Sequence, residues 1–154
     1  MVRLAGVTAS EDARPAVLMR KPSWLISEAA RVAQRLRTDE LDAAGSRGYH
    51  YRLLAALQEF GPASQASLSR HTGMDRSDVV AAVNELAARG LADRSPDPAD
   101  RRRNVITITP AGTAHLQLLE KLLGRVQDQL LAPLSPAERE QLTRLLTRIL
   151  AHHT

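Results

Sequence analysis

Apolar side chains recur at helical spacing along the chain from Pro22 onward, and glycine and proline divide this pattern into segments. The first segment predicts a helix over residues 23–37. The stretch 39–48 lacks the spacing and predicts a loop. A second helix is predicted over 49–60, because Gly61-Pro62 stops the pattern there.

The next two segments are shorter and begin with capping residues. Ser64 predicts the N-cap of a helix that ends near His71. A tight turn, 72–74, follows, and Asp75 predicts the N-cap of a helix over 76–89. The inner face of this helix is expected to consist of Val79, Ala82, Val83 and Leu86.

Beyond Gly90 the pattern changes to that of two short strands, 91–95 and 104–109. The second strand alternates threonine or valine with isoleucine. The loop between them, 96–103, contains two prolines and ends in three consecutive arginines. The pattern therefore predicts a β-hairpin with a long, charged tip.

The C-terminal part predicts two leucine-rich helices. Pro110 suits the first turn of the first of them, which Pro133 interrupts. Residues 135–138, Ser-Pro-Ala-Glu, are typical of a capping box that opens the last helix. Both helices carry more apolar surface than one small domain can cover, which indicates an interface with another chain.

This order of elements predicts the fold class: mainly α with a small β-hairpin wing, a winged helix-turn-helix over about 48–109. Residues 22–154 are expected to form one domain, and 1–21 a mobile N-terminal arm. The helices over about 23–37 and 110–152 flank the winged part and are the predicted dimerisation helices.

Composition excludes several kinds of function. The chain of 154 residues has no cysteine, so disulfides, thiolate metal sites and thiol chemistry are excluded. The histidines show no metal-ligand spacing, and no nucleophile-base or phosphate-binding glycine motif is present. We therefore expect no enzymatic activity, no cofactor and no metal. No run is apolar enough to span a membrane, so a cytoplasmic protein is expected.

The basic residues point to nucleic acid. Only Lys21 and Lys121 are lysines among 21 cations, so 19 are arginines, the residue suited to bidentate contact with phosphate and guanine. A GC-rich genome would also enrich arginine, and this explanation stays open. Aromatic residues make up 3% of the chain, too few for the base-stacking surfaces of single-strand binders. Double-stranded DNA is the favoured partner.

The helix over 76–89 has the features of a recognition helix for the major groove. Arg76 can pair with guanine, Ser77 with a base edge or a phosphate, and Val80 or Ala81 with a thymine methyl. Asp78 is interpreted as a first-turn acid, with acceptance from cytosine as the alternative. The complete set of candidate contacts in this part of the chain is Ser64, Gln65, Asp75, Arg76, Ser77, Val80, Ala81 and Asn84.

The hairpin tip supplies a second set of candidate contacts: Asp100, Arg101, Arg102 and Arg103. A narrow minor groove concentrates negative potential and attracts inserted arginine. Asp100 is expected to hold and aim the Arg102 guanidinium. The alternative is a solvated run of charge with no partner.

These motifs resemble the MarR-type winged-helix regulators. Residues 100–102, Asp-Arg-Arg, followed by 105–112, Val-Ile-Thr-Ile-Thr-Pro-Ala-Gly, are similar to the wing signature of that family. Residues 86–91 resemble its junction between recognition helix and wing, and 134–138 the start of its last helix. The resemblance covers about residues 23–150.

By this resemblance Arg102 is the minor-groove arginine, Asp100 orients it, and Arg101 and Arg103 lie near phosphates. It also implies a homodimer on a palindromic operator, most often acting as a repressor. Family members are often released from DNA by a small aromatic or anionic effector. The residues here that could line such a pocket are Trp24, His50, Tyr51 and Arg52. The alternative function is a dimeric winged-helix adaptor that binds protein and does not read DNA.

Overall fold

The computed structural model describes residues 13–154. The chain forms two compact units, one ending at Arg35 and the other beginning at Leu36. The boundary falls inside the first helix, α1 (Pro22–Ala43). The winged part, 48–109, belongs entirely to the second unit.

In the first unit, turns precede α1. The N–H of Leu18 donates to Pro15 O and that of Lys21 to Leu18 O, both at 3.0 Å. Glu28 of α1 pairs with Arg14 and, at 2.6 Å, with Arg31. Of the predicted arm, residues 1–12 lie outside the described part, while the rest is turn-rich and linked to the helix through Arg14.

The first helix is longer than the sequence pattern predicts. Residues 39–43, predicted as part of a loop, continue α1 to Ala43. The chain contains no glycine or proline between Pro22 and Gly45, and Leu41 is buried in the core with 1% of its surface exposed. The helix ends where Gly45 adopts a left-handed φ of 64°.

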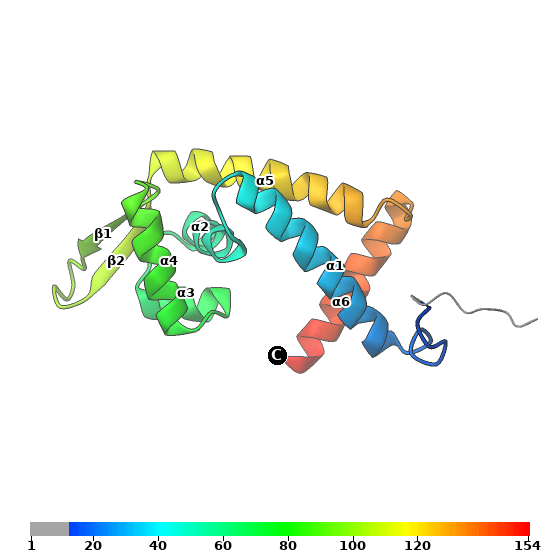
Figure 1. The fold of residues 1–154 in the computed structure, drawn as a ribbon. Coiled ribbons are helices and arrows are strands. Elements are labelled where there is room, and N and C mark those ends of the chain that lie inside the picture. The colour runs from blue at the N-terminus through cyan, green and yellow to red at the C-terminus, as the bar shows by residue number, and fades with distance from the viewer. Residues whose placement is uncertain (1–12) are drawn as a thin grey trace, which may run out of the picture. The chain divides into compact units, whose positions relative to one another are not determined.

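The core of the second unit forms around α2 (Gly48–Phe60), which packs against α3 (Gln65–Thr72), α4 (Arg76–Ala88) and α5 (Pro110–Leu130). These helices match the predicted ones to within one or two residues where bounds were predicted. Figure 1 shows α3 and α4 side by side next to the hairpin. The largest fully buried side chains of this core are Leu53, Leu54, Leu57, Leu68, Val79, Val83, Leu86, Ile106 and Leu119.

The predicted hairpin is confirmed, with β1 (Ala92–Pro96) antiparallel to β2 (Asn104–Ile108). Ala63, just before α3, adds a bridge to β2: its N–H donates to Ile106 O at 3.0 Å and its carbonyl accepts from Ile106 N at 2.8 Å. This bridge fixes the start of α3 on the wing.

The junction between β2 and α5 explains the Thr-Pro-Ala-Gly motif. Thr109 caps α5 by accepting from Gly112 N at 3.0 Å and donates from its hydroxyl to Gly90 O at 2.7 Å. A Cβ on Gly112 would lie 2.0 Å from the carbonyl oxygen of Leu91. Only glycine allows this close approach of the helix to the chain that leaves α4.

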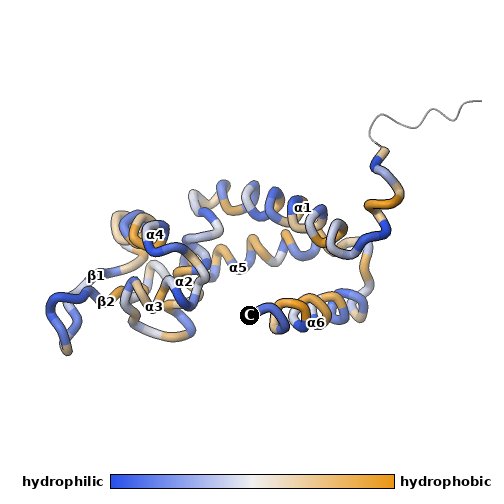
Figure 2. The backbone as a smooth tube through the Cα atoms, turned by 90° about the horizontal axis from the view of Figure 1, so that it is seen from below, coloured by the Kyte–Doolittle hydropathy of each residue, from blue (hydrophilic) through white to orange (hydrophobic). Residues whose placement is uncertain are grey.

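The last helix, α6 (Pro136–His153), begins with the predicted capping box. Ser135 Oγ accepts from Glu138 N at 3.3 Å, and the Glu138 carboxylate accepts from Ser135 N at 2.8 Å. None of its residues is buried, and apolar segments recur along it (Figure 2). No described helix is long and apolar enough to cross a membrane.

Candidate nucleic-acid interface

The helix-turn-helix is held by short-range hydrogen bonds. Ser64 caps α3 as predicted, accepting from Ser67 N at 3.2 Å. Gly73 ends α3 with a left-handed φ of 66°, and Ser69 Oγ donates to Met74 O across the turn at 2.6 Å. These bonds determine how α4 leaves the turn, and therefore where its first residues lie.

The start of α4 differs from expectation in one detail. Asp75 occupies the N-cap position, but its side chain makes no capping hydrogen bond. The predicted capping interaction of Asp75 is therefore wrong, although the helix begins where predicted. The turn before α4 contains Gly73 and the Ser69–Met74 bond, and the Asp75 side chain is exposed.

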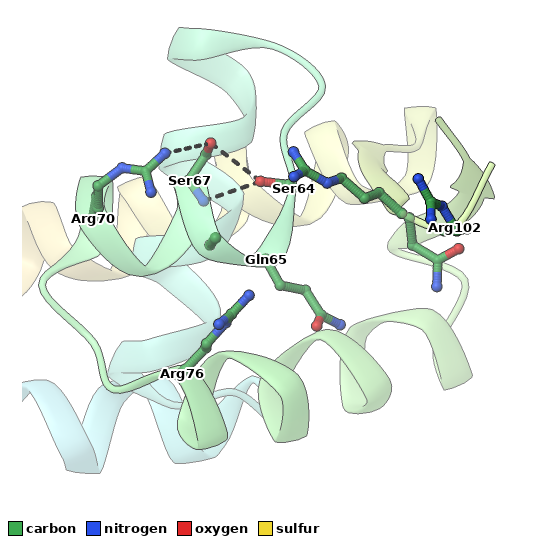
Figure 3. A pocket seen from close by; sticks show the side chains of 9 residues that line it. Ser64, Gln65, Ser67, Arg70, Arg76 and Arg102 are labelled. Carbon is green, nitrogen blue, oxygen red and sulfur yellow. Dashed lines mark hydrogen bonds between the residues drawn. The ribbon is translucent and has the colours of Figure 1, made fainter. Parts of the chain in front are cut away.

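An open pocket of about 560 Å³ lies between α3, the start of α4 and the tip of the wing (Figure 3). Among the described residues that line it, the charged ones are all arginines. Arg70 Nη2 donates to Ser67 Oγ at 3.0 Å, while Arg76 extends from α4 toward α3. The lining residues are Ser64, Gln65, Ala66, Ser67, Arg70, Arg76, Arg102, Arg103 and Asn104. This geometry suits an anionic group.

The wing tip is organised by Asp100. Its Oδ1 accepts from the Arg102 backbone N–H at 3.1 Å and from Arg102 Nε at 3.2 Å, the contact predicted from the sequence. Its Oδ2 lies 3.7 Å from Arg103 Nε. The Arg102 side chain is 91% exposed, so the acid restrains the arginine without covering it. Arg101 is also exposed at this tip.

The outer face of α4 presents the remaining predicted contacts. Arg76, Ser77, Val80 and Ala81 are all exposed. Asn84 is exposed too, but its side-chain oxygen accepts a hydrogen bond from Arg94 of β1. Arg70 and Arg94 were not predicted as site residues. The spacing of three residues between Ser67 and Arg70 is a weak sequence signal that the two side chains lie on one helix face. No such signal exists for Arg94, because it meets Asn84 only when the hairpin folds onto α4.

The predicted effector residues lie in different surroundings. His50 is 4% exposed; its Nδ1 accepts from Arg47 N at 3.1 Å and its Nε2 lies 2.6 Å from Glu85 Oε2. Tyr51 donates to Glu120 of α5 at 2.7 Å, and burial together with this contact raises the pKa of Tyr51 to about 12. Arg52 is exposed on α2, and Trp24, in the first unit, is 41% exposed.

A second buried polar group lies beside His50. Ser46 is 1% exposed; its hydroxyl lies 2.7 Å from His115 Nε2 and accepts from Arg89 at 3.2 Å. Burial, followed by the Arg89 guanidinium and His50, lowers the pKa of His115. Burial also lowers the pKa of His50, and Glu85 partly opposes this. Both shifts favour the neutral form of the ring.

The fold is that of a winged helix-turn-helix protein, and comparison with known proteins gives the family. Residues 46–103 match the model of the MarR family. The repressor NicR of Pseudomonas putida is 33% identical over 97 residues, 63% of this chain and 61% of NicR. The chain thus spans about three fifths of that curated relative.

Solved structures are similar over a longer stretch. A probable transcriptional regulator from Pseudomonas aeruginosa has a TM-score of 0.77 at 33% identity, covering 86% of this chain and 98% of that one. BpsR of Bordetella bronchiseptica, whose DNA binding is regulated by 6-hydroxynicotinic acid, has a TM-score of 0.75 at 25% identity, covering 84% and 93%.

This chain belongs to the MarR family of transcriptional regulators. The resemblance predicted from the wing motif is confirmed, as is the fold class. NicR is named as a transcriptional repressor and the Pseudomonas aeruginosa protein as a probable transcriptional regulator, which agrees with the expectation that this chain is not an enzyme.

Proposed function

We propose that this protein is a transcriptional repressor that binds double-stranded DNA with sequence preference. The observation that carries the proposal is the arginine-lined pocket, which joins the recognition helix, the start of α3 and the wing into one cationic surface. Its similarity to the repressor NicR supports the direction of regulation.

The arrangement of this surface indicates how the protein binds the DNA duplex. The exposed first turns of α4 enter the major groove, where Ser77, Val80 and Ala81 meet base edges. Arg102, restrained by Asp100, reaches the minor groove. Arg70 and Arg76 line the pocket and contact backbone phosphate, which fixes the position of the helix without reading sequence.

The protein acts as a homodimer on a palindromic operator. The apolar residues of α6 support this, since Leu145, Ile149 and Leu150 are 42%, 46% and 66% exposed. In the other unit, Trp24, Leu25 and Ile26 of α1 are each about two fifths exposed. A two-fold dimer would place its recognition helices in half-sites about 10 base pairs apart.

A small aromatic or anionic effector regulates DNA binding in this proposal. The support is BpsR, which responds to 6-hydroxynicotinic acid. Among the predicted effector residues, Arg52 is exposed and carries a charge that could bind a carboxylate. Both ring nitrogens of His50 already have partners, so its role would be indirect.

Salt dependence of binding tests this function against the adaptor alternative. Fluorescence anisotropy would follow a labelled duplex carrying a selected sequence between low and physiological salt. Because each neutralised phosphate contributes about −0.9 to the slope of log K against log salt, several contacts give a steep decrease. A protein that binds no duplex, or binds independently of salt, would favour the adaptor.

A further inference from the structure

The recognition helix is apolar on all sides over one of its turns. Residues 79–83 are five consecutive apolar residues, so apolar side chains surround this part of α4. Val79, Ala82 and Val83 are buried, while Val80 and Ala81 are exposed. Rotation by one residue, about 100°, would put Val80 in place of Val79 without loss of apolar area, but it would also put Asn84 in place of Val83 and Ala87 in place of Leu86. Burial of Val83 and Leu86 therefore selects the face of α4 that meets the core, whereas smaller rotations of the helix change the buried apolar area little.

Polar contacts near the end of the same helix restrict these smaller rotations. Glu85 Oε2 lies 2.6 Å from His50 Nε2 and accepts from the Tyr49 hydroxyl at 3.3 Å. Because Nδ1 of His50 accepts from the N–H of Arg47, the neutral ring carries its hydrogen on Nε2 and donates to Glu85. The buried ring thus connects the first turn of α2 to the recognition helix.

The neighbouring residue makes a second connection in another direction. Asn84 accepts from Arg94 of β1, whose strand partner Ile106 is fully buried. Adjacent helical residues point about 100° apart, so Asn84 and Glu85 attach α4 to two different elements. Two such contacts restrict rotation of the helix about its axis more than either alone.

We propose that Glu85 and Asn84 are positioning residues, which fix the rotation of α4 through His50 and Arg94 and so determine which side chains meet the DNA bases. This inference rests on the proposed DNA-binding function. Glu85 itself contacts Tyr49 and His50 of α2, so it acts through the orientation of α4 and not by contact with a base. Its loss should therefore affect discrimination between sequences more than contact with the DNA backbone.

The test compares two duplexes: one selected from a random pool by the wild-type chain, and a scrambled duplex of the same composition. Glu85→Ala should reduce the ratio of the two affinities by about tenfold, comparable to one good base contact. Affinity for the scrambled duplex should stay nearly constant, because phosphate contacts are kept. Glu85→Gln should restore most of the ratio, since its amide oxygen can accept from His50.

Glu120→Ala is the matched control. Glu120 accepts from Tyr51 at 2.7 Å and so connects the same helix α2 to α5 instead of α4. Its loss should lower the melting temperature similarly and leave the affinity ratio unchanged. Equal effects of the two variants on the ratio, or an unchanged ratio in Glu85→Ala, would overturn the inference.

A measurement without DNA separates the contact from its consequence. Because Glu85 opposes the effect of burial, Glu85→Ala should lower the pKa of His50 further in an NMR titration, and Glu120→Ala should not. An unchanged His50 titration would contradict the contact itself. A wild-type chain that prefers no duplex would contradict the proposed function and this inference with it, whereas a preference insensitive to Glu85→Ala contradicts this inference alone.

Discussion

Asp100 holds Arg102 at two points, through the backbone N–H at 3.1 Å and through Nε at 3.2 Å. The first contact shapes the loop, and the second directs the guanidinium. Because the arginine is 91% exposed, its terminal nitrogens stay available to another molecule. The acid therefore preorganises a cation that would otherwise sample many rotamers.

Replacing Arg102 tests whether the wing contributes to DNA binding. Arg102→Ala should weaken binding to a selected duplex. It should also reduce the magnitude of the slope of log K against log salt by about one, the contribution of one phosphate contact. Asp100→Ala should weaken binding less, since the arginine remains but loses its orientation. Arg125→Ala removes an equal charge from an exposed position on α5 and should leave affinity unchanged. Binding unaffected by Arg102→Ala would remove the wing from the interface.

Arg76 distinguishes phosphate contact from base reading. The sequence suggests a contact with guanine, but its side chain lines the pocket together with Arg70. Arg76→Ala should therefore weaken binding uniformly across a panel of single-base variants of the selected duplex, with a smaller salt slope. Relaxed preference at a single position per half-site would instead show that Arg76 reads a base.

Two glycines of α5 give opposite predictions for stability. Gly112→Ala would place Cβ 2.0 Å from Leu91 O, a backbone atom that cannot move freely, so unfolding should require about 3 kcal/mol less free energy. At Gly124 nothing lies within 4 Å of an added Cβ. Gly124→Ala should therefore raise stability by about 0.5–1 kcal/mol. Denaturant unfolding of both variants checks the pair, and a tolerated Gly112→Ala would contradict the described junction.

Stability should decrease in mild acid because of His50 and His115. Burial lowers the pKa of both below the ordinary value of 6.5. As pH falls below 6.5, the unfolded chain therefore binds protons that the folded chain does not, and the free energy of unfolding decreases until the lowered pKa is passed. The slope is at most about 1.4 kcal/mol per pH unit for each histidine.

Unfolding curves between neutral pH and mild acid measure this effect. The double variant His50→Gln, His115→Gln should show a flatter dependence on pH than the wild type. Equal slopes in the two proteins would mean that these histidines do not cause the loss of stability.

Local sequence signals predicted where the helices start. The features that they did not predict depend on tertiary contacts. The caps at Ser64 and Ser135 depend on residues within one turn, so their spacing is readable in the sequence. The last turns of α1 depend on burial of Leu41, which no local pattern records. The Asp75 position was right, but its side chain does not make the expected capping bond.

The same distinction applies to the candidate site. Asp100 and Arg102 are two residues apart, and their contact was predictable. Arg94 meets Asn84 only because the hairpin returns to α4, and His50 meets Glu85 across 35 residues of chain. Patterns of residue type identify the elements that bear function, while the polar contacts that orient those elements require the fold.

In the proposed function this chain reads a palindromic DNA sequence as a dimer. Selection of bound duplexes from a random pool by the purified full chain at physiological salt, followed by sequencing, is the most direct test of this function. We expect enrichment of a palindrome with half-sites about 10 base pairs apart. No enriched sequence, either from the purified chain or after refolding to remove a retained ligand, would contradict it.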